Sequence, residues 1–151
     1  MIIAFFGHSH FLKKPHLEDK MLDYLKDTAG DQAVELYLGE YGEFDRFAYD
    51  CCKKFKMNHP KASLVFVTPY LTASYQQNHL AEKQSRYDQI LYPNLEQVPP
   101  RYAISHRNKY MVDQADYIVV YIDHSWGGAY QAYSYARKKG KSVVNLAEME
   151  R

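Results

Sequence analysis

The chain has 151 residues with a formal net charge of +1 at pH 7, and 46% of the residues are hydrophobic. This length is typical of one domain, so residues 1–151 are interpreted as a single domain with a sizeable core. The near-neutral charge gives no electrostatic case for binding nucleic acid or an anionic membrane, and no apolar run approaches the roughly 20 residues of a membrane span.

Two features of the composition bear on location and on surface chemistry. Cys51 and Cys52 are adjacent, so they cannot form an ordinary disulfide framework. Because structural disulfides are rare in the cytosol, a cytoplasmic location is the simplest interpretation. The chain also has 15 tyrosines, whose large amphipathic rings suit pockets and interfaces.

The first part of the chain alternates strands with helices. The predicted elements, in order, are a strand at 2–6, a turn at Gly7-His8-Ser9-His10, a helix around Leu17, Met21 and Leu25 that ends near Gly30, a strand at 34–38, a turn at 39–45, a helix around Phe44, Phe47, Ala48, Cys51 and Phe55, and a strand at 62–67. The helices are recognised by apolar residues at helical spacing. Glycine follows the first strand at Gly7 and the second at Gly39 and Gly42.

Residues 68–102 break this rhythm with four prolines and five tyrosines. The pattern predicts a helix from about 78 to 90 and a short extended piece at Leu91-Tyr92. A connection of this length is usually functional or mobile. We interpret it as an inserted flap beside the carboxyl edge of the sheet; the alternative is a surface excursion that only covers apolar area.

A helix with Ile104, Met111 and Ala115 on its inward side precedes the next strand. Arg107 and Asn108 share that side by spacing. A cation on a core-facing stripe needs a partner or a route to solvent. Arg107 is therefore expected to contact a phosphate or carboxylate of a ligand. The alternative is that its side chain snorkels to solvent or pairs with an acid such as Asp45 or Asp113.

The stretch that follows organises the chain. Residues 117–122 are apolar on both faces, as a central parallel strand must be. Ser125-Trp126-Gly127-Gly128 follows the strand and leads into a helix at 129–139 that places Ala129, Ala132, Tyr133 and Ala136 on one face. Such turns lie where open α/β sheets bind ligands and where free N–H groups attract phosphate. A glycine pair that only makes a tight turn is the alternative.

The alternation of strands and helices predicts the fold class. We expect an α/β, three-layer, Rossmann-like sandwich with a mainly parallel sheet of five or more strands. The three glycine turns should then converge on one edge of that sheet.

Five motifs in this order resemble a known group. They are Gly7-His8-Ser9, the run Tyr37-Leu38-Gly39-Glu40-Tyr41-Gly42-Glu43-Phe44-Asp45, Thr68-Pro69-Tyr70, Arg107-Asn108-Lys109-Tyr110-Met111-Val112-Asp113, and Trp126-Gly127-Gly128. Over nearly the whole chain the sequence resembles the YpsA-type branch of the SLOG superfamily, which joins the DprA/Smf proteins and the LOG cytokinin-activating enzymes. The resemblance implies a Rossmann-like sheet, a site for a nucleotide or nucleotide-derived ligand, and a homo-oligomer.

The same resemblance bears on catalysis. LOG enzymes carry a Pro-Gly-Gly-x-Gly-Thr-x-x-Glu motif and an upstream arginine. Arg107, Gly127 and Gly128 match this pattern, but Ser134 stands at the position of the glutamate. Without that carboxylate no group is evident that would stabilise oxocarbenium-like charge or activate water. The chain therefore resembles members that sense ligands, and no catalytic residue is predicted.

Other chemistries find weaker support. The expected strand ends carry four residues that could bind a metal together: His8, His10, His124 and Asp123. The compact spacings of zinc motifs are absent, so no metal site and no cofactor is predicted. No Gly-x-Ser-x-Gly nucleophile elbow occurs. Ser9 and Ser125 are better interpreted as hydroxyl donors, and His8 as either a ligand contact or a structural turn residue.

The sequence thus predicts a protein that binds or senses a nucleotide-like ligand at the carboxyl edge of its sheet. Two alternatives remain: an N-glycosidase or nucleotide hydrolase that uses Asp45 or Asp123, and an interaction module that uses the tyrosine-rich segment. The predicted ligand-binding residues are Gly7, His8, Ser9, Gly39, Tyr41, Gly42, Asp45, Thr68, Tyr70, Arg107, Asn108, Ser125, Trp126, Gly127 and Gly128.

Overall fold

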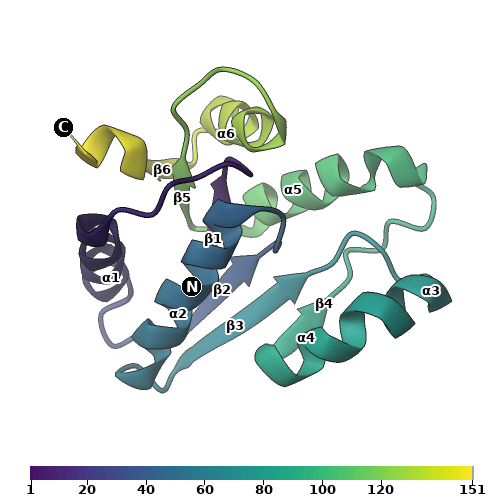
Figure 1. Cartoon of the computed structure of the whole chain (residues 1–151), viewed down its shortest axis with the longest axis horizontal. Coiled ribbons are helices and arrows are strands. Elements are labelled where there is room, and N and C mark those ends of the chain that lie inside the picture. The colour runs from purple at the N-terminus through teal and green to yellow at the C-terminus, as the bar shows by residue number, and fades with distance from the viewer. Residues whose placement is uncertain (151) are drawn as a thin grey trace.

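A six-stranded parallel sheet forms the centre of the computed structural model, which describes residues 1–150 (Figure 1). The order of the strands is β4-β3-β2-β1-β5-β6, and every neighbouring pair is parallel. The strands are β1 (Ile2–Gly7), β2 (Val34–Leu38), β3 (Ala62–Val67), β4 (Gln89–Leu91), β5 (Tyr117–Tyr121) and β6 (Ser142–Asn145). This confirms the predicted fold class.

The order of the strands reverses beside β1. The chain first adds β2, β3 and β4 on one side of β1 and then returns to add β5 and β6 on the other side. In the register of the central strands, Ile3 lies opposite Leu36 of β2 and Tyr117 of β5. Open α/β sheets bind ligands at the carboxyl ends of the strands on either side of such a reversal.

Helices cover both faces of the sheet (Figure 1). They are α1 (Pro15–Ala29), α2 (Glu43–Met57), α3 (Ala73–Tyr75), α4 (Ala81–Arg86), α5 (Ala103–Gln114) and α6 (Gly128–Lys138), with the π-helical η1 (Gln76–Leu80) and the short 3-10 helices η2 (Pro100–Tyr102) and η3 (Leu146–Glu150). No helix within residues 1–150 is long and apolar enough to cross a membrane.

The core consists of two clusters, one on each face of the sheet. In β1, Ile3 and Phe5 belong to the first cluster, which contains the apolar faces of α1 and α2. Ala4 and Phe6 belong to the second cluster, which contains residues of α5 and α6. Successive side chains of a strand point to opposite faces, so a strand that is apolar throughout can serve both clusters.

The predicted elements of the central sheet are confirmed. The strands expected at 2–6, 34–38, 62–67 and 117–122 and the helix expected at 129–139 all form, with ends that differ by at most about one residue, within the usual uncertainty of element boundaries. Small residues at Ala132 and Ala136 let α6 lie close to the sheet, where both are buried.

The prediction for residues 68–102 is wrong in part. The helical stretch spans 73–86 instead of 78–90 and starts after Thr72, whose Oγ1 accepts the Tyr75 N–H at 3.2 Å. Gln89–Leu91, expected largely within that helix, forms β4 and pairs with β3. A three-residue edge strand is too short to produce a periodic pattern. Part of this segment thus belongs to the sheet, and flap behaviour of the rest stays a prediction.

A substitution at Gly7 tests how closely β1 and α2 approach each other. A Cβ at this position would lie 2.1 Å from Cγ of Phe44, whose ring is fully buried. We expect Gly7→Ala to lower the free energy of unfolding by about 1–3 kcal/mol, the usual cost of overpacking a core. Urea denaturation measures this change.

Gly128→Ala is the matched control for Gly7→Ala. Gly128 also lines the turns at the carboxyl edge of the sheet, but a Cβ there would have no atom within 4 Å, and the residue is the first of α6. Its stability should stay within about 0.5 kcal/mol of the wild type. Equal stabilities of the two variants would contradict the close approach of Phe44 to β1.

Candidate functional site

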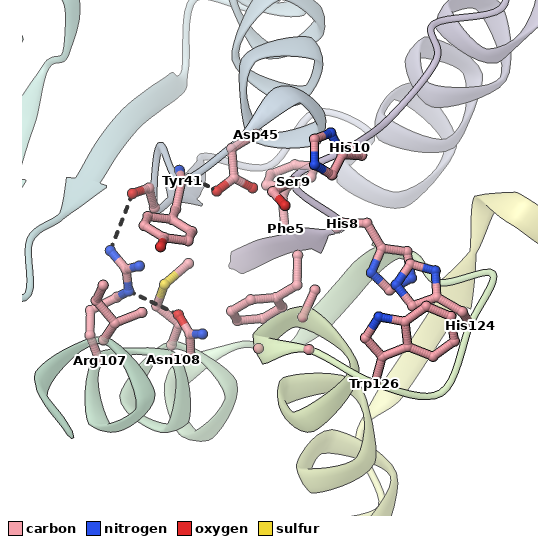
Figure 2. A pocket seen from close by; sticks show the side chains of 18 residues that line it. Phe5, His8, Ser9, His10, Tyr41, Asp45, Arg107, Asn108, His124 and Trp126 are labelled. Atoms are coloured by element: carbon pink, nitrogen blue, oxygen red, sulfur yellow. Dashed lines mark hydrogen bonds between the residues drawn. The ribbon is translucent and has the colours of Figure 1, made fainter. Parts of the chain in front are cut away.

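A cavity of about 320 Å³ lies at the carboxyl ends of β1, β2 and β5, where the strand order reverses (Figure 2). The three glycine turns converge here as expected, since Gly7, Gly39 and Gly127 all line it. Of the predicted ligand-binding residues, the cavity brings together Gly7, His8, Ser9, Gly39, Tyr41, Asp45, Arg107, Asn108, Trp126, Gly127 and Gly128.

Four predicted residues lie outside this cavity. Gly42 packs so closely against Ser9 that a Cβ at Gly42 would lie 2.5 Å from Cα of Ser9. Thr68 is buried and donates its hydroxyl to the Tyr70 carbonyl at 2.9 Å, and the Tyr70 hydroxyl donates to the Pro100 carbonyl at 3.1 Å. Ser125 lines a separate polar cavity that also involves Tyr133 and Arg137. These side chains shape or flank the loops around the cavity.

Several lining residues were not predicted as ligand contacts. They are Phe5, Phe6, His10, Ile104, Met111, His124 and Ala129. The apolar members belong to strands and helices whose apolar pattern identifies them as core, so the sequence gives no sign that one edge of them faces a cavity. His124 could have been found, since it lies in the glycine turn directly after β5.

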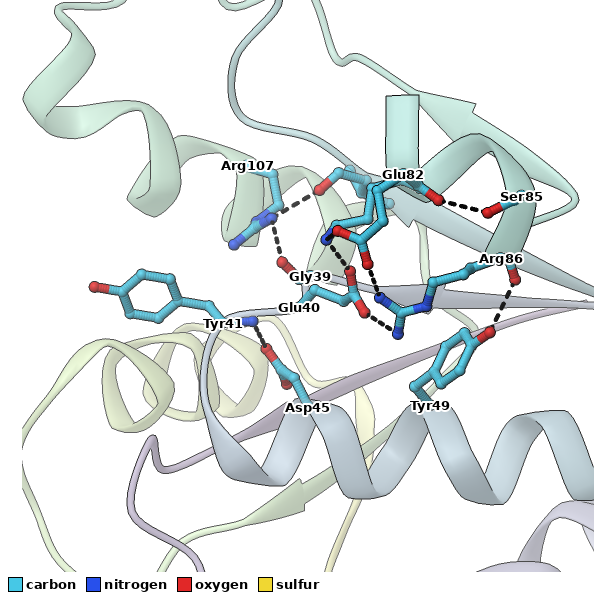
Figure 3. A network of polar contacts seen from close by, with 11 residues as sticks. Gly39, Glu40, Tyr41, Asp45, Tyr49, Glu82, Ser85, Arg86 and Arg107 are labelled. Carbon is cyan, nitrogen blue, oxygen red and sulfur yellow. Dashed lines mark hydrogen bonds and ion pairs between the residues drawn. The ribbon is translucent and has the colours of Figure 1, made fainter. Parts of the chain in front are cut away.

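Arg107 is the only nearly fully buried cation among the described residues, at 2% exposure. Its Nη1 donates to the carbonyl of Val67 at 2.7 Å and to that of Gly39 at 3.2 Å, and its Nε donates to Oδ1 of Asn108 at 2.9 Å (Figures 2 and 3). The guanidinium thus joins α5 to the carboxyl ends of β2 and β3.

No carboxylate within residues 1–150 lies within ion-pair distance of Arg107, so the ion-pair alternative is wrong. Asp113 instead accepts the Tyr135 hydroxyl at 2.8 Å, and Asp45 accepts the Tyr41 N–H at 2.6 Å. Burial lowers the pKa of Arg107, and the nearby charge of Asp45 opposes that shift. Arginine stays protonated in proteins, and among the described residues its Nη2 has no hydrogen-bond partner.

The turn that carries Gly39 and Tyr41 is fixed by an ion-pair network (Figure 3). Glu40 has a positive φ of 49°, and its carboxylate contacts Nζ of Lys83 at 2.9 Å and Nη2 of Arg86 at 2.6 Å. Both cations belong to α4, and Glu40 is largely buried, so the pairs are shielded from solvent. The network therefore ties the segment after β3 to one rim of the cavity.

Asp45 supplies an acid beside Tyr41 at the same rim. It lies in the first turn of α2 and is buried, at 7% exposure. Burial raises the pKa of Asp45 to about 7, while the Tyr41 N–H and the charge of Arg107 act in the opposite direction. A carboxyl with this pKa can donate or accept a hydrogen bond at neutral pH.

Three aromatic rings form a wall on the β5 side of the cavity (Figure 2). The rings of His8 and His124 stack with centroids 3.4 Å apart and an angle of 13° between planes. Trp126 continues the stack at 3.9 Å from His124 and is 69% exposed. Its open face can therefore receive a further flat ring.

The amino end of α6 forms the neighbouring part of the wall. Gly127 has a φ of 95° and precedes the helix, and no side chain caps the free N–H groups of the first turn. The first N–H groups of a helix have no intrahelical acceptor and carry partial positive charge. Together with Arg107, this end gives the cavity two features that attract an anion.

Comparison with known proteins gives matches in structure alone. No family model matches the chain, and no curated protein matches it. DNA processing protein A from Helicobacter pylori, studied for its single-stranded DNA binding mode, has a TM-score of 0.62 and 15% identity over 95% of this chain and 63% of its own. The chain therefore shares the Rossmann-like fold of this protein.

Two further solved structures agree with this result. DNA processing protein A from Streptococcus pneumoniae has a TM-score of 0.62 and 12% identity, covering 93% of this chain and 48% of its own. The structural genomics target TM1055 has a TM-score of 0.58 and 16% identity, covering 94% of this chain and 71% of its own. This chain therefore spans less than two thirds of either DNA processing protein, and the likeness establishes the fold alone.

The pKa of Asp45 predicts a specific pH dependence of stability. In the unfolded chain the group titrates near its ordinary value of 3.8, whereas in the fold it titrates near 7. Between these values the folded chain holds a proton that the unfolded chain has lost, so the contribution of Asp45 to stability declines as the pH rises from about 4 to about 7 and levels off above that. Asp45→Asn removes this titration and keeps an oxygen for the Tyr41 N–H.

We therefore expect the stability of Asp45→Asn, relative to the wild type, to increase between about pH 4 and pH 8, by up to about 4 kcal/mol. Urea denaturation of both proteins across this range measures the difference. The exposed Asp50→Asn, also on α2, is the control and should show no such trend. A difference between Asp45→Asn and wild type that does not vary with pH would contradict the assigned titration.

Proposed function

We propose that the cavity binds a nucleotide or nucleotide-derived ligand and that the protein senses this ligand without transforming it. The observation that carries the proposal is the pair of anion-attracting features in one cavity, Arg107 and the uncapped amino end of α6. Arg107 keeps Nη2 free while its other nitrogens are bonded, so the fold orients the guanidinium before any ligand arrives. A phosphate is the group that both features suit.

The rest of the cavity supports a ligand with a flat ring and hydroxyl groups. Trp126 and Tyr41 lie at its rim with exposed rings, and nucleobases stack well on such rings. Asp45 and Asn108 could bond ribose hydroxyls. A volume of about 320 Å³ is at the small end of the range for small-molecule sites, about 300–1,000 Å³.

The non-catalytic part of the proposal rests on what α6 lacks. Ser134, at the position of the LOG glutamate, does not line the cavity, so its hydroxyl cannot replace that carboxylate. One observation favours a hydrolase as the second candidate: Asp45 lines the cavity with a pKa of about 7, which suits a general acid. Asp123, the other acid considered, lines the neighbouring cavity.

Location, oligomeric state and nucleic-acid binding complete the proposal. Two free, buried thiols, Cys51 and Cys52, agree with a cytoplasmic location. Membership of the YpsA-like branch and homo-oligomerisation rest on the resemblance of the sequence motifs. The Helicobacter protein is described as binding single-stranded DNA, but a net charge of +1 gives this chain little attraction for a phosphate backbone.

Calorimetric titration with a panel of nucleoside monophosphates tests the proposal. We expect saturable binding of at least one member, weaker binding of its nucleoside, and no release of free base by chromatography. Trp126→Ala should weaken binding by about 1–3 kcal/mol because the stacking surface is lost. Met57→Ala, which removes an equally exposed apolar side chain at the far end of α2, is the control and should bind like the wild type.

Three outcomes would contradict the proposal. Multiple-turnover release of base, lost in Asp45→Asn, would make the protein a hydrolase. Binding of a single-stranded oligonucleotide without binding of any mononucleotide would assign the site to nucleic acid. Absence of binding to every compound tested would favour the interaction module.

A further inference from the structure

Three possible metal ligands meet beside the nucleotide cavity, and the proposed function uses none of them as such. His8 follows β1 and His124 follows β5 (Figure 2). Asp123 directly precedes His124 in the same turn. Their ligand atoms all lie within 4.8 Å of one another. The parallel pairing of β1 with β5 creates this group from residues 115 and 116 positions apart in sequence, which explains why the compact spacing of zinc motifs is absent.

The distances within the cluster are close to those that one ion requires. Nε2 of His8 lies 3.4 Å from Oδ1 of Asp123, and Nδ1 of His124 lies 2.7 Å from the same oxygen. Nitrogen and oxygen ligands that share an ion at about 2.0–2.2 Å in tetrahedral geometry are separated by about 3.3–3.6 Å. The contact between Asp123 and His124 must lengthen by somewhat under an ångström.

The charges in the cluster also suit a cation. The carboxylate of Asp123 contacts both imidazoles, and among the described residues no lysine or arginine lies within ion-pair distance of it. His8 accepts the Asp123 N–H at Nε2, at a rather long 3.2 Å. A bound ion would replace this weak bond and the hydrogen bond between Asp123 and His124 with two nitrogen ligands and one oxygen ligand.

We propose that His8, Asp123 and His124 form a binding site for a divalent transition-metal ion such as Zn²⁺ or Co²⁺. Two imidazoles and one carboxylate form a ligand set that these ions accept, and the set leaves coordination positions open toward solvent or a ligand. The proposal departs from the expectation drawn from the sequence, which contains no such spacing. It does not depend on the proposed nucleotide binding.

Binding requires one defined rearrangement. The two imidazole rings are nearly parallel, so their in-plane lone pairs run side by side and cannot meet at one ion. His8 is buried and fixed, whereas His124 lies in the turn with 27% of its side chain exposed and can rotate. Rotation of His124 would break its contact with Trp126. Since Trp126 is the only tryptophan of the chain, its fluorescence reports this movement.

Titration of the whole protein with Zn²⁺ and with Co²⁺, in the absence of nucleotide, tests the proposal. Calorimetry should show one ion per chain, Co²⁺ should produce visible absorption bands, and the fluorescence of Trp126 should change in step with occupancy. Asp123→Asn and His124→Asn each remove one ligand at an accessible turn and should weaken binding at least tenfold. His16→Asn removes an exposed histidine outside the cluster and is the control.

Several results would overturn the assignment. They are the absence of saturable binding, equal affinities for wild type and both ligand variants, and a thiolate-to-cobalt charge-transfer band that places the ion at Cys51 or Cys52. Because no nucleotide enters these titrations, their failure leaves the nucleotide proposal intact, and failure of nucleotide binding leaves the metal result intact.

Discussion

The carboxyl edge of the sheet depends on the guanidinium of Arg107. Parallel strands end in carbonyl groups that have no partner in the sheet, and a buried carbonyl without a partner is costly. Arg107 meets two of these carbonyls, at Val67 and Gly39, and is itself held by Asn108. Gly39 permits this contact, since a Cβ there would lie 3.0 Å from Cζ of Arg107. The Arg107 side chain therefore stabilises the ends of two strands and also supplies the positive charge of the cavity. Its loss would weaken the fold as well as any anion binding.

The position of the cavity follows from strand order and from small residues at the turns. Strand order reverses between β1 and β5, so the turns after these strands diverge and leave space between them. Phe44 packs against Gly7 and draws α2 toward the end of β1, which brings Asp45 and Tyr41 to the rim. Burial at this site keeps the carboxyl of Asp45 partly protonated at neutral pH. The same low dielectric would strengthen the interaction of Arg107 with the proposed anion.

Much of this arrangement could be predicted from the sequence. Strands that are apolar throughout and glycines at their ends predict a parallel sheet with converging turns, because the signal of each element is local. The partners of Arg107 could not be predicted, since helical spacing places the side chain on an inward face without saying which groups it meets there. The short strand β4 was expected about two residues too late, at Leu91-Tyr92, because three residues carry no periodic signal that fixes their bounds. The meeting of His8 with His124 depends on long-range pairing of β1 with β5.

The most direct test of the account is the identity of a small molecule that the protein retains from the cell. The protein would be purified gently, its mass measured under native conditions, and the released compound identified by liquid chromatography and mass spectrometry. We expect one phosphorylated, nucleotide-derived compound per chain, with reduced occupancy in Trp126→Ala. A retained compound that lacks phosphate, or a protein that stays empty even after incubation with a cell extract, would contradict this expectation.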